Sequence, residues 1–341
     1  NDKGLQLATQ NQWAEAAQVF RHAADIDPGM TLYWEEAAQA FAREGDIEAA
    51  LPLWKRAVHD DPYWALSQAT IAVLSQDSVA MEPALALAPE SHLFELNLGA
   101  LAETTGDAAA ARTAYLRAIS LRPATRQALF WQQTSLRISI LTEWQATQPA
   151  DDSALARGWA ALEAGNINQA HTLFDQARRE SPLNNEPYRG LARAYWASGD
   201  EAQAEYYLRV GQNIPTTHIS QTLDFKLLEG DWAEAHYDLS GAMNAYEWVF
   251  FAFNDYTSDG PGTYGYPWRS WVVYHHTALP SDIVPQFIHA DITSEMDVRF
   301  AKLARWHIEN GEQATGCYIL ARVYHEAPAS ESGNLWRQLC P

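Results

Sequence analysis

The sequence predicts an all-α protein built as a solenoid of antiparallel helix pairs, and three recurring features predict it. Prolines recur at intervals of 34 residues, as at Pro28 and Pro62 and again at Pro89 and Pro123. Between these prolines, alanine or glycine recurs three or four residues from an aromatic residue, which is the spacing of one helix face. A glycine followed by a residue that can cap a helix separates two segments whose apolar residues recur with the period of a helix. A period of roughly 20–50 residues is typical of repeat architectures.

The unit between Pro28 and Pro62 shows how each element forms. The apolar face of its first helix consists of Trp34, Ala37, Ala38 and Phe41. The apolar face of its second helix consists of Ala50, Trp54 and Ala57. Gly45-Asp46 separates the helices, because glycine tolerates positive φ after a helix and aspartate caps the next one. Pro62 ends the unit, since proline cannot continue a helix interior. Alanine and glycine let the two backbones approach, and the aromatic residue fills the groove.

The same order returns along the chain. The copies are Gly99, Gly106-Asp107, Ala111, Tyr115, Ala118 and Pro123; Gly158, Gly165-Asn166, Ala170, Phe174, Ala177 and Pro182; Tyr195, Gly199-Asp200, Ala204, Leu208 and Pro215; and Gly311-Glu312, Gly316, Leu320 and Pro328. The interval from Pro62 to Pro89 is shorter and predicts a short second helix. Residues 125–144 are either one long helix or an imperfect pair. The unit from His218 is expected to turn at Gly230-Asp231.

This pattern resembles the tetratricopeptide repeat, a right-handed superhelical solenoid of helix pairs. The resemblance covers residues 1–243 and 296–328. It implies a solenoid of about seven units over residues 1–243, two of them irregular. Residues 244–295 form a divergent, aromatic-rich insertion, and residues 296–341 a final helix pair with a C-terminal cap.

Charge and motifs exclude several classes of function. With 43 acidic and 23 basic residues, the net charge is -20, which argues against nucleic acid or an anionic membrane as the main partner. The longest strongly apolar run, residues 245–253, contains Glu247 and is too short to span a membrane, although a membrane segment could precede Asn1. Esterase, phosphate-loop, zinc-protease and dinucleotide motifs are all absent, so we expect neither an enzyme nor a cofactor.

The sequence contains only weak signals for metal binding or for chemistry at the cysteines. Asp255, Thr257 and Asp259 copy the first half of a calcium loop, but Tyr266 replaces the closing glutamate, so a polar turn is the favoured interpretation. The adjacent histidines His275-His276 would point about 100° apart on a helix and cannot share one ion unaided. Cys317 and Cys340 are either paired or free, and the sequence leaves both readings open.

The resemblance also implies a binding surface. In a tetratricopeptide solenoid the first helix of each pair lines the concave groove, where ligands usually dock. The repeat phase places seven candidates there, namely Glu35, Gln39, Arg43, Trp159, Arg189, Arg193 and Trp196. Guanidinium and indole groups together bind carboxylates, aromatic rings or sugar faces, whereas packing between repeats is the alternative interpretation. The lysine and asparagine clamp with which relatives grip acidic chaperone tails is not reproduced at these positions.

A second group of candidates lies in the divergent segment. Its aromatic residues include Tyr256, Tyr264, Tyr266, Trp268 and Trp271. They are expected to cap the solenoid, to contact another subunit, or to form stacking platforms for sugars.

The later half of the chain is similar to the soluble tails of bacterial O-antigen-ligase-type membrane proteins, through its Tyr/Trp-rich segment, the stretch at 279–285 and one further helix pair. This resemblance implies an extracytoplasmic, non-catalytic role. We therefore predict a scaffold that binds a protein, or a glycan, in a bacterial cell-envelope or polysaccharide assembly. The alternative is a structural subunit that associates through its solenoid ends into an oligomer or extracellular filament, with residues 329–341 either covering an end or inserting into a neighbour.

Overall fold

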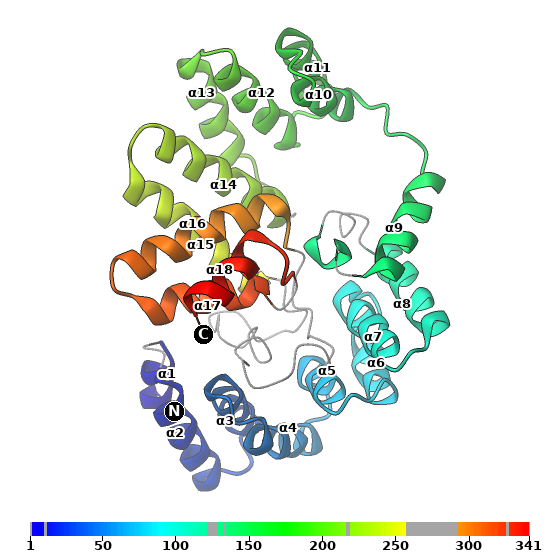
Figure 1. The fold of residues 1–341 in the computed structure, drawn as a ribbon, viewed down its shortest axis with the longest axis vertical. Helices are drawn as coiled ribbons and strands as arrows, with labels where there is room; N and C mark the ends of the chain where they lie inside the picture. Colours follow the sequence, from blue (N-terminus) through cyan, green and yellow to red (C-terminus); the bar gives the residue numbers. More distant parts are fainter. Residues whose placement is uncertain are drawn as a thin grey trace. The chain divides into compact units, whose positions relative to one another are not determined.

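The computed structural model describes residues 2–9, 12–121, 128–132, 134–215, 219–256, 292–324 and 327–340. Throughout these ranges the regular elements are α-helices and short 3₁₀ turns, and consecutive helices pack as antiparallel pairs (Figure 1). The predicted all-α solenoid of helix pairs is confirmed.

The chain forms two compact units. Unit 1 comprises residues 1–146 and 250–341, and unit 2 comprises residues 147–249. Unit 1 contains α1 (Asp2–Thr9), α2 (Trp13–Ile26), α3 (Thr31–Glu44), α4 (Ile47–Asp60), α5 (Ala65–Leu74), η1 (Val79–Met81), α6 (Glu82–Leu87), α7 (His92–Thr104), α8 (Ala108–Leu121), η3 (Leu129–Gln132), α9 (Ser135–Thr147), α16 (Ser294–Glu309), α17 (Gln313–Tyr324) and α18 (Glu331–Leu339). Unit 2 contains α10 (Ala154–Glu163), α11 (Ile167–Glu180), α12 (Glu186–Ala197), α13 (Glu201–Gln212), α14 (Ile219–Ala235) and most of α15 (Leu239–Tyr256).

The irregular intervals have simple structural causes. The second helix after Pro62 is α6, which is six residues long, as the shortened interval predicts. Over residues 125–144 the sequence left open one long helix or an imperfect pair, and the described part consists of the 3₁₀ turn η3 and the helix α9, with residues 122–127 and 133 outside the described ranges.

A glycine against an aromatic ring recurs inside the helix pairs. Gly99 lies against Tyr115, Gly158 against Phe174, and in each case a Cβ on the glycine would overlap the ring. Gly4 with Phe20 and Gly230 with Tyr246 repeat the contact, and all four pairs are 16 residues apart in the sequence. The four rings are fully buried. A bare backbone is therefore needed where each ring packs.

The turns between paired helices use glycine for a different reason. Gly106, Gly165 and Gly199 have φ near +80°, and nothing lies within 4 Å of the position a Cβ would take. Backbone conformation rather than space selects glycine at these turns. In two of them the next residue caps the second helix, since Asp107 accepts from the amide of Ala110 at 2.9 Å, and Asp200 does the same for Gln203 at 3.1 Å.

The expected turn at Gly230-Asp231 is wrong. Both residues lie inside α14, where Gly230 provides the close approach to Tyr246. The turn comes seven residues later at Tyr237-Asp238, where Tyr237 has φ of 61° and Asp238 accepts from the amide of Gly241 at 2.8 Å. Glycine has two roles in these helix pairs, close packing against a ring and the turn between the helices. The sequence pattern assigned Gly230 to the turn, whereas it is a packing position.

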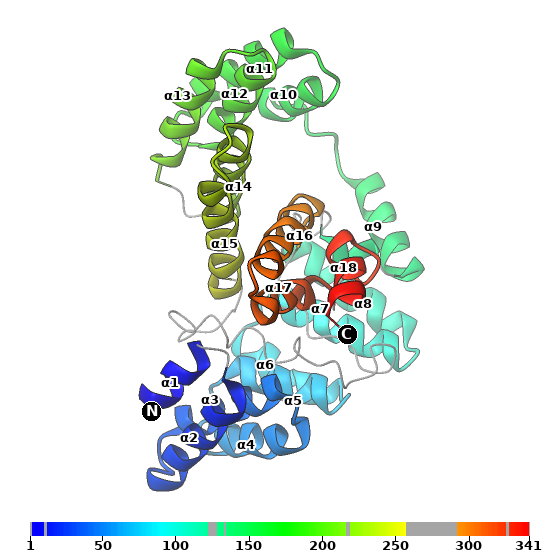
Figure 2. The same cartoon turned by 60° about the vertical axis from the view of Figure 1, so that its left-hand side comes forward.

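The C-terminal helix α18 packs on the helix pair α16–α17 of its own chain (Figure 2). At its start, the Asp297 carboxylate of α16 accepts from the amides of Glu331 and Ser332, both at 3.0 Å. At its end, Cys340 forms a disulfide with Cys317 of α17, which decides between the two readings that the sequence left open. Trp336 stacks on Tyr324 with ring centroids 4.2 Å apart.

Two distant parts of unit 1 meet just before α16. Ala128 and Thr293 form an isolated antiparallel bridge, and the amide of Leu129 donates to the carbonyl of Ile292 at 2.7 Å. This contact joins η3 to the start of the final helix pair, so residues 128–132 tie the two sequence segments of unit 1 together.

Replacing Gly230 with alanine tests the reassigned role of this glycine. The new methyl group would overlap the Tyr246 ring, and overpacking of this kind costs about 1–3 kcal/mol of unfolding free energy. Urea unfolding of the whole chain measures it. Unchanged stability in Gly230→Ala would contradict the close contact.

The disulfide generates a second prediction. Replacing Cys317 and Cys340 together with serine is expected to lower the unfolding free energy by about 2–4 kcal/mol, because the bond closes a loop in the unfolded chain. Hydrogen exchange should rise most in α18. Titration of the unreduced native chain with a thiol reagent is the control, and two reactive thiols would contradict the bond.

Candidate functional site

Unit 1 holds three of the predicted groove residues on α3. Glu35 and Gln39 lie on the same face, with the Gln39 amide 3.4 Å from the Glu35 carboxylate, and Ser67 of α5 donates to that carboxylate at 3.3 Å. Both Glu35 and Gln39 are buried, at 2% and 1% exposure. The side chain of Arg43 lies outside the described part of the structure. A binding role for these three residues stays a prediction.

Unit 2 brings the other four candidates onto one face. Trp159 comes from α10, whereas Arg189, Arg193 and Trp196 come from α12, and all four are half-buried. The spacing of residues 189, 193 and 196 places them on successive turns of one side of α12. We call these four residues, together with Asp224 of α14, the Arg–Trp face.

A row of contacts crosses three helices of this face. The Arg189 guanidinium lies over the Trp159 ring at 4.5 Å, pairs with Glu186 at 2.7 Å, and reaches Asp224 at 3.5 Å. Trp159 in turn packs edge-on against Phe174 at 5.0 Å. The charge of Arg189 is thus compensated by two carboxylates. The row is preorganised and is not an isolated anion site.

A second row lies one to two turns further along the same helices. The Trp196 ring meets Trp232 of α14 edge-on at 5.3 Å, and Trp232 contacts His236 at 4.3 Å. The two rows leave indole faces, a guanidinium and carboxylates on one half-buried surface. Such a surface suits a peptide with mixed polar and aromatic side chains, or a sugar ring that stacks on indole.

The second group of candidates falls almost wholly outside the described residues. Tyr264, Tyr266, Trp268 and Trp271 lie there, as do Thr257 and Asp259 of the calcium-like turn. Tyr256 and Asp255 belong to the last turn of α15, and their side chains are not described. Among the described residues no group of three or more His, Cys, Asp or Glu side chains is arranged to hold a metal ion.

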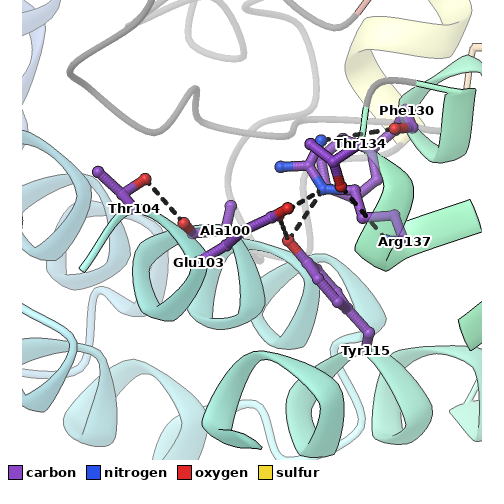
Figure 3. A network of polar contacts seen from close by, with 7 residues as sticks. All are labelled: Ala100, Glu103, Thr104, Tyr115, Phe130, Thr134 and Arg137. Atoms are coloured by element: carbon purple, nitrogen blue, oxygen red, sulfur yellow. Dashed lines mark hydrogen bonds and ion pairs between the residues drawn. The ribbon is translucent and has the colours of Figure 1, made fainter. Parts of the chain in front are cut away.

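Sequence reasoning missed a buried polar network in unit 1 (Figure 3). Nε of Arg137 donates to the Glu103 carboxylate at 2.9 Å and to the Tyr115 hydroxyl at 3.0 Å, while that hydroxyl donates to Glu103 at 2.7 Å. The Arg137 guanidinium also lies 3.8 Å from the centre of the Phe130 ring. The network joins α7, α8, η3 and α9.

One signal could have revealed this network. Glu103 and Arg137 are 34 residues apart, which is the repeat period, so they occupy matching positions in neighbouring first helices. Because the arginine is buried and its charge is met inside the fold, the network is structural support for unit 1 rather than a ligand site.

Burial also governs two tyrosine hydroxyls. It raises the pKa of Tyr115 well above the usual value; the Arg137 guanidinium partly opposes this rise, and the Glu103 carboxylate adds to it. Burial likewise raises the pKa of Tyr246, helped by the carboxylates of Asp231 and Glu234 that accept from its hydroxyl at 2.8 and 3.1 Å.

With this geometry in hand, the chain can be compared with known proteins. Residues 1–65 and 155–215 match the tetratricopeptide repeat family. These two stretches are similar to tetratricopeptide repeats. They span α1–α4 and α10–α13, so the similarity extends to both units and includes most residues of the Arg–Trp face. No curated protein sequence matches the chain significantly.

Several solved structures are similar to this chain. A tetratricopeptide repeat protein from Parabacteroides merdae is 13% identical over 73% of this chain and 90% of that one, with a TM-score of 0.33. PilW, a type IV pilus biogenesis factor, is 18% identical over 64% and 91%, with a TM-score of 0.25. Yeast Tom70 is 11% identical over 99% and 93%, with a TM-score of 0.31.

No helix in the described ranges combines the length and the apolar character that crossing a membrane requires.

The raised pKa values generate a prediction about pH. Below about pH 10 both tyrosines are neutral in the folded and in the unfolded chain, so their ionisation does not lower the free energy of unfolding. Above it the unfolded chain releases protons that the folded chain retains, so the unfolding free energy falls as pH rises further. In denaturant unfolding from pH 8 to 11, Tyr246→Phe should flatten this fall, whereas the exposed control Tyr63→Phe should not. Identical slopes in all three proteins would contradict the assignment.

Proposed function

We propose that this chain is a non-catalytic scaffold that binds a protein partner through the Arg–Trp face of unit 2. Tetratricopeptide repeats support a protein-binding role in general, because stacked helix pairs present an extended surface. The observation that carries the specific proposal is the row Trp159–Arg189–Asp224, which holds an indole, a guanidinium and a carboxylate in fixed positions across three helices.

The composition of this face suits a peptide more than a charged small molecule. Arginine and tryptophan are the residues that contribute most to protein interfaces when they are partly buried and held rigidly. Since Arg189 is already compensated by Glu186 and Asp224, an anion would gain little there. Arg193 and Trp196, one and two turns further along α12, extend the surface along the helix.

We further propose that the scaffold works outside the cytoplasm, in a bacterial cell-envelope or polysaccharide assembly. Two features support this setting. The disulfide between Cys317 and Cys340 belongs to the class of bonds that persist in oxidising compartments. The similarity of the later half of the sequence to O-antigen-ligase-type tails points the same way, and it makes a glycan the second ligand class to test.

Peptide and glycan arrays probed with the purified chain test the proposal. A hit should weaken by about fivefold or more when Trp196 or Arg193 is replaced with alanine, because central interface residues of these types usually cost over about 1 kcal/mol when truncated. Arg189 is not used, since its replacement would also remove its ion pairs with Glu186 and Asp224 and so disturb the face itself.

The matched control is Arg179→Ala on α11, an arginine with a 63% exposed side chain on a second helix. If neither Trp196→Ala nor Arg193→Ala weakens binding, the ligand binds elsewhere and the Arg–Trp face is not the site. Sedimentation at rising concentration addresses the alternative of a self-associating subunit, for which the expected result is growth in size with concentration.

A further inference from the structure

Tyr237 presents an exposed aromatic ring at a backbone position that normally holds glycine. It has φ of 61°, and the matching turns of the described repeats carry Gly45, Gly106, Gly165, Gly199 and Gly311, all with positive φ. Gln76 is the other non-glycine residue in this conformation within the described ranges. The left-handed region disfavours residues with a Cβ, so a large side chain here works against the stability of the turn.

The ring gains almost nothing inside the chain to offset this cost. Tyr237 is 97% exposed, and no aromatic or cation–π contact of its ring occurs among the described residues. Leu239, two residues later at the first position of α15, is 50% exposed. At the same position of other second helices, Ile47 and Ile167 pack against the core. An aromatic and an aliphatic side chain thus project together from this turn.

Acidic residues adjoin the two apolar side chains. Asp238 lies between them in the sequence and is exposed. His236 lies 3.7 Å from the Glu201 carboxylate, so the start of α13, with Asp200 and Glu201, adjoins the same turn. Glu201 is 66% exposed. We call Tyr237, Leu239, Asp238 and Glu201 the Tyr237 edge.

We propose that the Tyr237 edge is a docking surface for a basic segment of a partner protein. Arginine or lysine would lay its aliphatic stem along Leu239, place its cationic group over the Tyr237 ring, and pair with the surrounding carboxylates. The charge of the edge selects the sign of the partner. The net charge of -20 disfavours a second copy of this chain as the occupant, because two copies repel each other.

This surface is separate from the Arg–Trp face in its chemistry and in the elements that build it. The Arg–Trp face lies on the sides of α10, α12 and α14, whereas the Tyr237 edge lies at the ends of α13, α14 and α15 where the paired helices turn. The proposal therefore does not depend on the function assigned to the Arg–Trp face.

The test uses the whole chain and two fluorescein-labelled octapeptides, one alternating arginine with leucine and one alternating glutamate with leucine. Fluorescence anisotropy measures binding to the wild type and to Tyr237→Gly. Glycine restores the residue found in the other turns, so this variant is expected to fold and to melt at or slightly above the wild-type temperature. It should bind the arginine peptide about threefold to tenfold more weakly, the range expected for loss of a cation–π contact.

The matched control is Tyr63→Ala. Tyr63 is 78% exposed and follows the carboxylates of Asp60 and Asp61, but it does not occupy a left-handed turn. This variant should bind the arginine peptide within about twofold of the wild type, and added salt should weaken binding in every case.

Three results would overturn the proposal. Equal losses in Tyr237→Gly and Tyr63→Ala would mean general attraction to the acidic chain. Equal binding of the glutamate peptide would mean that the edge recognises apolar groups alone. Self-association of the wild type that disappears in Tyr237→Gly, measured by sedimentation, would make a second copy the occupant.

Discussion

In four of the helix pairs, the contact between a glycine of the first helix and an aromatic ring of the second is the constraint on which the packing depends. Gly158 with Phe174 and Gly230 with Tyr246 show it most clearly, since the buried ring occupies the space that a Cβ would need. The ring rests on bare backbone, so the two helices approach closely and in one register. With the register set, the turn between them has a fixed length, and the second glycine or its substitute must adopt the left-handed conformation.

Where a regular partner helix is missing, polar contacts and covalent bonds take its place. Among the described residues of unit 1, no partner helix directly follows α9 in the sequence, and Arg137 holds α9 to Glu103 and Tyr115 of the preceding pair. The terminal helix α18 is held at one end by Asp297 and at the other by the disulfide. Directional interactions are suited to these places, because a short helix buries too little apolar surface to fix its own orientation.

The two surfaces of unit 2 illustrate how one fold can offer different chemistry at its sides and at its turns. On the sides of the first helices, charges compensate one another across neighbouring repeats, and the Arg189 pair with Asp224 leaves indole rings and hydrogen-bonding groups as the distinguishing features. At the turns, the aspartates that cap helices are exposed, as Asp238 is. Tyr237, in place of the usual glycine, adds an exposed aromatic ring beside it.

The sequence by itself determined the helix pairs, most of their turns and the short α6, because these depend on local spacing of small residues, glycine-led turns and proline. Only the tertiary structure showed that Gly230 is a packing position and Tyr237 the turn, since glycine is required at both kinds of place for different reasons. The phase predicted that Trp159, Arg189 and Trp196 share a face. Their partners Asp224 and Trp232 could not be foreseen, because contacts between neighbouring repeats depend on how closely the helices pack, and that distance is set by side chains throughout the core.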